Sequence, residues 1–283
     1  MFLPSPANIT FMNPRSSALG FVCALLSVAL QASLIGAQQA EAKPARLETS
    51  TPTPNPILVE LFTSEGCSSC PPADLLLQKM DTQPIAGAQL IVLSEHVTYW
   101  DHDGWKDPNS SSVLTDRQSS YESALRHDTS FTPQIIVDGT EEIRVGNPQH
   151  ISDVLHKEKD DPKLPVHITQ LAIDPGNPNL LRARIETDAN PGKRTADVYV
   201  ALALSHVESQ VLRGENGGRH LVHVAVVQQL TKLGKLPKGS TFAQEVQLQL
   251  APGTDPDNLR LIAFVQEPGP GRLVGAAMER PGH

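Results

Sequence analysis

Residues 57–72 read ILVELFTSEGCSSCPP and decide the fold of this 283-residue chain. The first six residues, ILVELF, are mostly apolar, which is typical of a buried β-strand. A polar turn follows at residues 63–66, and Cys67 begins a segment whose apolar spacing predicts a helix to about Met80. The stretch therefore predicts a strand, a turn and a helix, with the first cysteine near the start of the helix.

The spacing Cys67-Ser68-Ser69-Cys70 makes this turn a candidate reactive site. At a helix N-terminus, unpaired backbone N–H groups and the helix dipole lower the pKa of a thiol, so Cys67 is the candidate nucleophile. Cys70 can attack the mixed disulfide that Cys67 forms, which makes it the candidate resolving thiol. A structural disulfide or half of a metal site gives the same spacing, but the chain has no second C-x-x-C to complete a four-sulfur site.

The following segments complete an α/β unit. Residues 89–94 (QLIVLS) form a second apolar strand, which predicts a right-handed β-α-β crossover and a parallel strand pair. We further expect a helix over residues 115–126, a hairpin turn at Asp138-Gly139, and a closing helix from Pro148 to about Lys159. These elements define an α/β domain.

The remainder of the sequence alternates apolar and polar residues between turn signals. This pattern predicts seven short strands, and hence an all-β, sandwich-like domain over residues 165–283 after the α/β domain at 57–160. His220 and His223 lie at opposite parity on one of these strands, after a polar hairpin turn. We therefore expect them on opposite faces, as surface histidines.

The N-terminus is typical of an export signal followed by a tether. The apolar run from Ala18 to Leu30 is shorter than a membrane-spanning helix, and Ala40-Glu41-Ala42 supplies the small residues that a signal peptidase reads. We expect a signal peptide at residues 1–42, with an uncleaved anchor as the alternative, and a proline-rich linker at 43–56. The mature protein would then be periplasmic or secreted.

Net charge and cysteine content limit the classes of partner that we expect for the protein. The net charge of −8 argues against nucleic acid and against anionic membrane surfaces. Cys23 lies in the predicted signal peptide, so Cys67 and Cys70 are the only thiols of the predicted mature chain. In an oxidising compartment we expect protein or small-molecule thiols and disulfides as their partners. No cofactor motif is present, so we expect no cofactor, and the sequence leaves the oligomeric state open.

A polar loop at residues 95–107 contains His96 and both tryptophans of the chain, Trp100 and Trp105. The tryptophans are candidate substrate-binding residues, because the loop can present aromatic surface to a client. Alternatively, His96 could join the two cysteines as a ligand for Cu(I) or Zn. A packed loop with buried tryptophans would give the same sequence.

The C-x-x-C pair and Thr132-Pro133 together resemble the thioredoxin superfamily. In that superfamily the pair opens the first helix after a central strand, and a cis-proline in a later loop faces it. The resemblance implies a thioredoxin-like fold for residues 57–160. It also implies that Pro133 belongs to the catalytic site with Cys67 and Cys70 and shapes the client groove. We expect Thr132, next to it, to bind substrate.

More specifically, residues 59–74 (VELFTSEGCSSCPPAD) resemble the opening motif of a bacterial secreted family known only as a domain of unknown function. Thr98 and His102 depart from the pattern of that family. The resemblance implies the thioredoxin-like fold but no established substrate. Later segments that also match are His96-Val97, Tyr99-Trp100-Asp101, Gly104–Pro108, Thr132-Pro133, Gly214-Glu215-Asn216, Gly218-Arg219 and Ala263–Gln266.

Three functions are consistent with these observations. The leading hypothesis is an exported thiol-disulfide oxidoreductase in which Cys67 attacks and Cys70 resolves. The first alternative is copper or zinc binding through Cys67, Cys70 and His96. The second is a non-catalytic binding module on a thioredoxin scaffold, because one fold hosts many functions. The sequence leaves the redox direction open between reductant, oxidant and isomerase.

Overall fold

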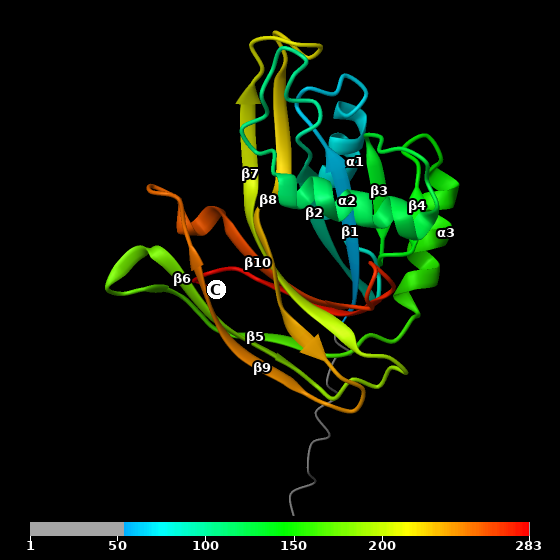
Figure 1. Cartoon of the computed structure of the whole chain (residues 1–283), viewed down its shortest axis with the longest axis vertical. Helices are drawn as coiled ribbons and strands as arrows, with labels where there is room; N and C mark the ends of the chain where they lie inside the picture. Colours follow the sequence, from blue (N-terminus) through cyan, green and yellow to red (C-terminus); the bar gives the residue numbers. More distant parts are fainter. Residues whose placement is uncertain (1–53, 283) are drawn as a thin grey trace, which may run out of the picture. The chain divides into compact units, whose positions relative to one another are not determined.

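The computed structural model describes residues 54–282, which belong to one compact unit of the chain (Figure 1). The predicted signal peptide at 1–42 and most of the predicted linker at 43–56 lie outside the described residues, so both stay predictions. Within the described part, no helix is long and apolar enough to cross a membrane.

The α/β part begins with a parallel strand pair. β1 (Asn55–Thr63) and β2 (Ala88–His96) lie in register, from Asn55 opposite Ala88 to Thr63 opposite His96. Between them, α1 (Pro71–Thr82) begins with two prolines, which fit the first turn of a helix because no intrahelical N–H bond is needed there. The expected β-α-β unit is therefore confirmed, and both strands end at the sheet edge where α1 starts.

The other expected elements of the α/β part are also present. β3 runs antiparallel to β1 and pairs on its other side with β4. The turn between them has Asp138 at φ 48° and Gly139 at φ 76°, the left-handed region that a tight hairpin turn uses. The elements are α2 (Ser112–Leu125), β3 (Gln134–Val137), β4 (Glu141–Ile143) and α3 (Pro148–Lys159).

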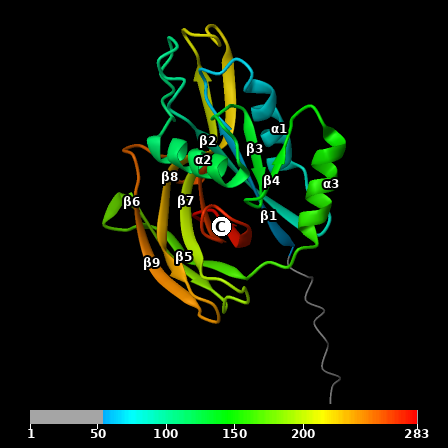
Figure 2. The same ribbon diagram turned by 45° about the vertical axis from the view of Figure 1, so that its right-hand side comes forward.

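The helices cover both faces of this part of the sheet (Figure 2). Ile57, Val59 and Leu61 of β1 pack in one buried cluster with side chains of α1 and α3. Phe62, which points to the opposite face, packs with Tyr121 of α2. Because successive side chains of a strand point to opposite faces, the apolar run of β1 is buried on both sides.

All seven strands expected in the C-terminal part are present. They are joined by short turns, with one short 3₁₀ helix (Pro256–Asn258) before the sixth. The strands are β5 (Val166–Asp174), β6 (Asn177–Thr187), β7 (Ala196–Gln210), β8 (His220–Leu236), β9 (Phe242–Gln249), β10 (Leu259–Gln266) and β11 (Leu273–Glu279).

Their pairing corrects the expectation of a self-contained, all-β sandwich. Four of the seven strands extend the sheet of the α/β part, giving one mixed sheet in the order β11-β10-β7-β8-β2-β1-β3-β4. Only β5, β6 and β9 form a separate antiparallel sheet, which packs its apolar face on β7, β10 and β11. The fold is therefore mixed α/β, with a sandwich-like layer at one end. Alternation in the sequence predicts that a segment forms a strand, but it does not predict the neighbouring strand. Here the free edge of β2 is available for pairing, and β8 pairs with it.

The junction between the two parts of the sheet is short and reinforced by side chains. β8 pairs with β2 in parallel, with Val226 opposite Ser94. Gln78 of α1 donates to the Val222 carbonyl over 2.6 Å. The buried Arg260 also forms two hydrogen bonds with the Asp81 carboxylate, over 2.7 and 3.1 Å. These contacts hold β8 and β10 against the second half of α1.

Candidate functional site

The two cysteines form a disulfide at the carboxyl end of β1. Their Cα atoms are 5.4 Å apart, and both side chains are fully buried. Cys70 is the N-cap of α1, whereas Cys67 lies in the preceding turn, where its backbone N–H donates to the Ser64 carbonyl over 3.1 Å. The pair thus opens the first helix, with Cys70 at the helix start and Cys67 three residues before it.

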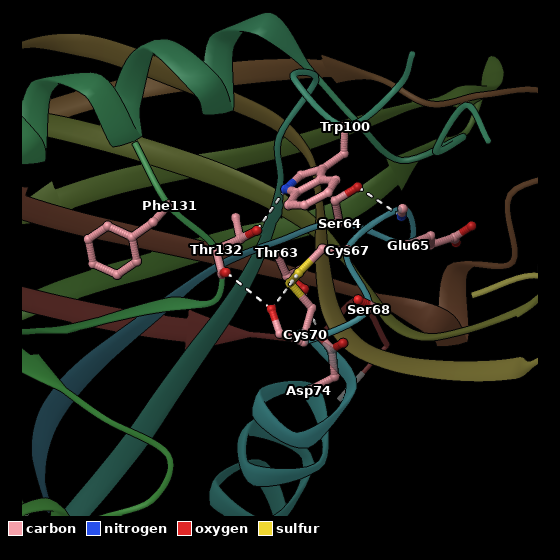
Figure 3. The surroundings of a disulfide bond; sticks show 12 residues. Thr63, Ser64, Glu65, Cys67, Ser68, Cys70, Asp74, Trp100, Phe131 and Thr132 are labelled. Carbon is pink, nitrogen blue, oxygen red and sulfur yellow. Dashed lines mark hydrogen bonds between the residues drawn. A yellow bond between two sulfur atoms is a disulfide. The ribbon is translucent and has the colours of Figure 1, made fainter. Parts of the chain in front are cut away.

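A cis peptide bond joins Thr132 to Pro133 in the loop before β3, as the resemblance implies. This proline loop lies against the disulfide turn, because Ser69 Oγ donates to the Thr132 carbonyl over 3.4 Å. Figure 3 shows Thr132 beside the disulfide, with the half-exposed Phe131 next to it. The structure therefore brings together the cysteine pair and the Thr132-Pro133 segment.

Trp100 reaches across the disulfide from the Trp loop, which we define as residues 97–111 between β2 and α2. Its Nε1 donates to Thr132 Oγ1 over 2.8 Å, and Figure 3 shows its indole ring on the side of the disulfide away from α1. Gly66 makes room for it, because a Cβ at this position would lie 3.1 Å from the Trp100 Cβ. Trp100 thus covers the disulfide, and its hydrogen bond engages the Thr132 hydroxyl of the proline loop.

Trp105, the second tryptophan of the Trp loop, has a different partner. Its Nε1 donates to Glu65 Oε2 over 2.8 Å, while Asn109 Nδ2 donates to Glu65 Oε1 over 3.4 Å. Because Glu65 is fully buried, these two donors hold its carboxylate in place. Of the two candidate binding tryptophans, we therefore place Trp100 at the disulfide and assign Trp105 to the support of Glu65.

The tip loop, residues 211–219 between β7 and β8, also closes on the disulfide turn. Asn216 is fully buried, and its Nδ2 donates to the carbonyls of Glu65, over 2.8 Å, and Cys67, over 2.9 Å. The Glu215 carboxylate accepts the Ser68 backbone N–H over 3.2 Å. The local sequence of the tip loop predicts a polar hairpin turn, and the family resemblance includes Gly214-Glu215-Asn216. Neither predicts these contacts, because they join residues distant along the chain.

Gly214 lets the tip loop approach the Trp loop. Its φ of +76° lies in the left-handed region that favours glycine, and an added Cβ would lie only 2.9 Å from the Asp103 carbonyl oxygen. Such a contact is too short for any other residue without a shift of the backbone. The disulfide turn is therefore enclosed by two loops that also contact each other.

Five buried titratable side chains gather next to the disulfide turn, and we call them the His–carboxylate cluster. They come from the disulfide turn, α1, β2, the Trp loop and β8, and each is at least nine-tenths buried. Burying so many ionisable groups in one place is costly unless they neutralise one another, and such clusters are enriched at functional sites. The members are Glu65, Asp74, His96, Asp107 and His223.

Within the cluster, His96 and Asp107 form a close pair. Nδ1 of His96 lies 2.7 Å from Asp107 Oδ2, which also accepts the Glu65 backbone N–H over 2.8 Å. Burial alone would lower the pKa of His96, but Asp107, and more weakly Asp74 and Glu65, outweigh it and raise that pKa. Burial would raise the pKa of Asp107, but His96 and two backbone donors lower it. Each partner therefore favours the charged form of the other.

The metal hypothesis draws no support from this geometry. In the disulfide, Cys67 and Cys70 offer no thiolate, and His96 already bonds to Asp107. Among residues 54–282, no group of three His, Cys, Asp or Glu side chains is arranged to hold a metal ion. His96 therefore belongs to the buried cluster, and its role as a metal ligand stays a prediction.

His223 corrects the expectation of a surface histidine. It faces away from the exposed His220, as predicted, but its side chain is only 1 % exposed. Its ring centroid lies 4.8 Å from that of His96, Nδ1 lies 3.6 Å from Asp74 Oδ1, and Nε2 lies 3.9 Å from Glu65 Oε1. Neither nitrogen has a hydrogen-bond partner in the described structure. One signal could have indicated its burial: it shares parity with apolar residues of β8.

A second buried polar group lies on the α2 face of the sheet, and we call it the helix-face network. Arg117 lies 2.5 Å from Glu60, and Tyr121 donates its hydroxyl to the same carboxylate. Burial, and then the neighbouring Glu60, raises the pKa of Glu95 well above its ordinary value, and Arg117 only partly offsets this. The members are Glu60, Glu95, Arg117, Tyr121 and Gln266.

Two of the solved structures that resemble the chain cover most of it. One is a crystal structure of a protein from Agrobacterium tumefaciens, with a TM-score of 0.64 and 28 % identity, covering 82 % of this chain and 97 % of that one. The other is HBP35 of Porphyromonas gingivalis, with a TM-score of 0.58 and 16 % identity, covering 81 % of this chain and 76 % of that one. At such low identity the second likeness shows the fold alone, which is thioredoxin-like.

Sequence comparison gives the family directly. Among curated proteins no match is found. Residues 58–266 match the family described as "Protein of unknown function (DUF1223)", which spans both the cysteine pair and the tip loop. The chain therefore belongs to the DUF1223 family, and it has a thioredoxin-like fold with a C-x-x-C disulfide between Cys67 and Cys70.

Proposed function

We propose that the chain is an exported thiol-disulfide oxidoreductase that acts through the Cys67–Cys70 pair. The observation that carries the proposal is the disulfide at the start of α1, against the cis Thr132–Pro133 loop of a thioredoxin-like fold. A bridge of this spacing closes a very short ring, so it constrains the unfolded chain little and is a poor structural staple. Exchange chemistry explains the pair better.

Cys67 is the sulfur that a client meets first. Its Sγ lies 3.4 Å from the hydroxyl of the exposed Ser69, whereas Cys70 is the N-cap and its carbonyl accepts the Ala73 backbone N–H over 2.8 Å. A client thiolate attacks Cys67 Sγ, the client–Cys67 bond forms, and Cys70 leaves with the electron pair and gains a proton. A second client thiol loses its proton and attacks the client sulfur, so the client leaves as a disulfide and Cys67 as a thiol.

Two electrons thus pass from the client dithiol to the protein, and the reverse sequence reduces a client disulfide. Both sulfurs are fully buried in the described form, so a client must displace the indole of Trp100 before it can react. Thr132 Oγ1, the acceptor for Trp100 Nε1, would then be free for the client. In this proposal Pro133 and Thr132 shape the client groove, and Trp100 controls access to it.

The clients we propose are protein or small-molecule thiols and disulfides, in the periplasm or outside the cell. The support for this location is the apolar N-terminal run followed by Ala40-Glu41-Ala42. An oxidising compartment also suits a disulfide, since the cytosol keeps most thiols reduced. The net charge of −8 disfavours nucleic acid as a partner.

The experiment incubates the purified, exported chain with oxidised or reduced glutathione and follows adducts by mass spectrometry. We expect exchange in the wild type. Cys70→Ser should accumulate one glutathione mixed disulfide at Cys67, because the resolving thiol is missing, whereas Cys67→Ser should react far more slowly. An exposed-site variant, Ser68→Ala, serves as the control. A wild-type protein that exchanges with neither form of glutathione, although its unfolded cysteines do, would contradict the proposal.

A further inference from the structure

We infer that Asp74 and His223 form the acid–base pair that takes the proton from the Cys70 thiol and returns it. The inference rests on the proposed thiol-disulfide exchange and adds the groups that handle its proton. Asp74 belongs to α1 and His223 to β8, so the pair exists only because β8 extends the thioredoxin-like sheet.

Cys70 needs such a partner because it is fully buried. In each cycle its sulfur passes between the disulfide and the thiol, and the thiol must lose its proton before it can attack. Water does not reach this sulfur in the described form. A thiolate formed in a dry, uncompensated site is unfavourable, so a buried acceptor close to Cys70 would speed the step.

Asp74 is placed to be this acceptor. It lies one helical turn after Cys70, and its backbone N–H donates to the Cys70 carbonyl over 3.2 Å. Figure 3 shows its side chain just beyond Cys70, on the α1 side of the disulfide. One carboxylate oxygen accepts from Thr63 Oγ1 over 3.1 Å, and the side chain is only 6 % exposed. The carboxylate is therefore fixed one helical turn from the residue whose sulfur must lose its proton.

His223 is placed to accept the proton from Asp74. Its Nδ1 lies 3.6 Å from Asp74 Oδ1, and neither ring nitrogen has a hydrogen-bond partner, although the side chain is 1 % exposed. A buried imidazole without partners is destabilising, so its position calls for an explanation other than packing. Ala225, two residues further along β8, has φ 51°, a strained conformation that is enriched at functional sites.

The other members of the cluster surround the His223 ring. Glu65 faces its Nε2 at 3.9 Å, and the ring of His96, paired with Asp107, lies 4.8 Å away. The cluster contains three carboxylates and two imidazoles, so a proton that reaches His223 lies among negatively charged groups. The hydrogen bonds from Trp105 and Asn109 keep Glu65 in place during the transfer.

In the resolving step, the Cys70 thiol gives its proton through the Asp74 carboxylate to His223. The Cys70 thiolate attacks Cys67 Sγ, the Cys67–Cys70 bond forms, the bond between Cys67 and the client breaks, and the client leaves as a thiolate. The proton passes from His223 to water before the next cycle. In the opposite direction, His223 and Asp74 supply the proton to Cys70 as it leaves.

Stopped-flow absorbance with the reduced, exported chain and Ellman's reagent tests the inference, because each sulfur releases one coloured thiolate in turn. The first release reports attack by Cys67, and the second reports resolution by Cys70. In Asp74→Asn we expect an unchanged first step and a second step slowed about 100-fold at neutral pH. Its rate should rise about tenfold per pH unit where the wild-type rate is level, because hydroxide replaces the missing base.

His223→Gln should also slow the second step. This variant decides the test if Asp74→Asn does not fold. His220→Gln is the matched control, because His220 lies on the same strand but is exposed. The inference is overturned if both variants keep the wild-type second step and pH profile. A wild-type protein without any first step would instead contradict the exchange function itself, so the two failures are distinguishable.

Discussion

The His–carboxylate cluster and the helix-face network are two buried polar groups, and they differ in the side chains at their centre. The network is centred on Arg117, whose charge is permanent and whose pKa is raised further because Glu60 outweighs the effect of burial. The cluster contains two imidazoles, the side chains that gain and lose protons near neutral pH. A fixed charge suits a structural role, whereas an exchangeable proton suits a reacting sulfur.

The two groups also differ in the chain segments that build them. Most of the helix-face network comes from β1, β2 and α2, with Gln266 of β10 as its contribution from the C-terminal part. The His–carboxylate cluster is incomplete without β8, and the tip loop closes over it. The C-terminal strands therefore do more than enlarge the sheet, because they complete the surroundings of the disulfide.

The largest effect that would test this comparison is expected from Arg117→Gln. The change leaves Glu60 buried without its cation, so unfolding in urea should show a loss of about 3–5 kcal/mol. The double variant with Glu60→Gln should recover part of that loss, because the uncompensated charge is gone. Exchange in the folded variant should keep its wild-type pH profile. A changed profile would show that the network, too, takes part in the chemistry.

Asn216→Ala sharpens the comparison by opening the tip loop. The carbonyls of Glu65 and Cys67 lose a buried donor, so we expect a loss of about 1–3 kcal/mol in stability. Reduction of the disulfide by dithiothreitol should become faster, because the loop that closes over it is held less tightly. Leu212→Ala in the same loop is the control, since Leu212 is 71 % exposed. Equal reduction rates in both variants would count against closure by the tip loop.

Most elements of the fold could be predicted from local patterns. The apolar run of β1, the proline at the start of α3 and the Asp138-Gly139 turn each carry their signal within a few residues. The pairing of β8 with β2 could not be predicted in this way. It depends on a contact between Ser94 and Val226, and alternation identifies a strand without identifying its neighbour.

The residues of the candidate site also differ in whether a local sequence motif predicts them. The cysteine pair and Thr132-Pro133 were found from sequence because each carries a short motif. Asp74 lies inside the opening motif but has no special spacing, and His223 and Asn216 enter the site through tertiary contacts alone. His223 shares parity with Leu221 and Ala225, both buried, so the apolar face of β8 was the available signal for its burial.

Glu95→Gln tests the electrostatics of the helix-face network through pH. The folded-state pKa of Glu95 is raised, mainly by burial, whereas an unfolded glutamate ionises above about pH 4.3. The folded wild type therefore holds the proton more tightly and loses stability as the pH rises above that value. The variant avoids this loss and should be more stable at neutral pH by about 1 kcal/mol, with the advantage disappearing near pH 4. Thermal unfolding at neutral pH and near pH 4 measures this gain in stability. The exposed-site variant Glu279→Gln is the control. An equal gain at the two pH values would contradict a titration effect.

The smallest expected effect concerns the cover over the disulfide. Thr132→Val keeps the shape of the side chain but removes the acceptor for Trp100 Nε1, a hydrogen bond of 2.8 Å. A neutral hydrogen bond contributes about 1 kcal/mol, so the uncovered form should become about fivefold more populated. Reduction by dithiothreitol should then be about fivefold faster, while Thr140→Val on the exposed hairpin turn should leave the rate unchanged. Because the variant alters neither buried group, the pH dependence of its exchange should match that of the wild type. A shifted profile would mean that Trp100 shields the His–carboxylate cluster as well as the sulfurs.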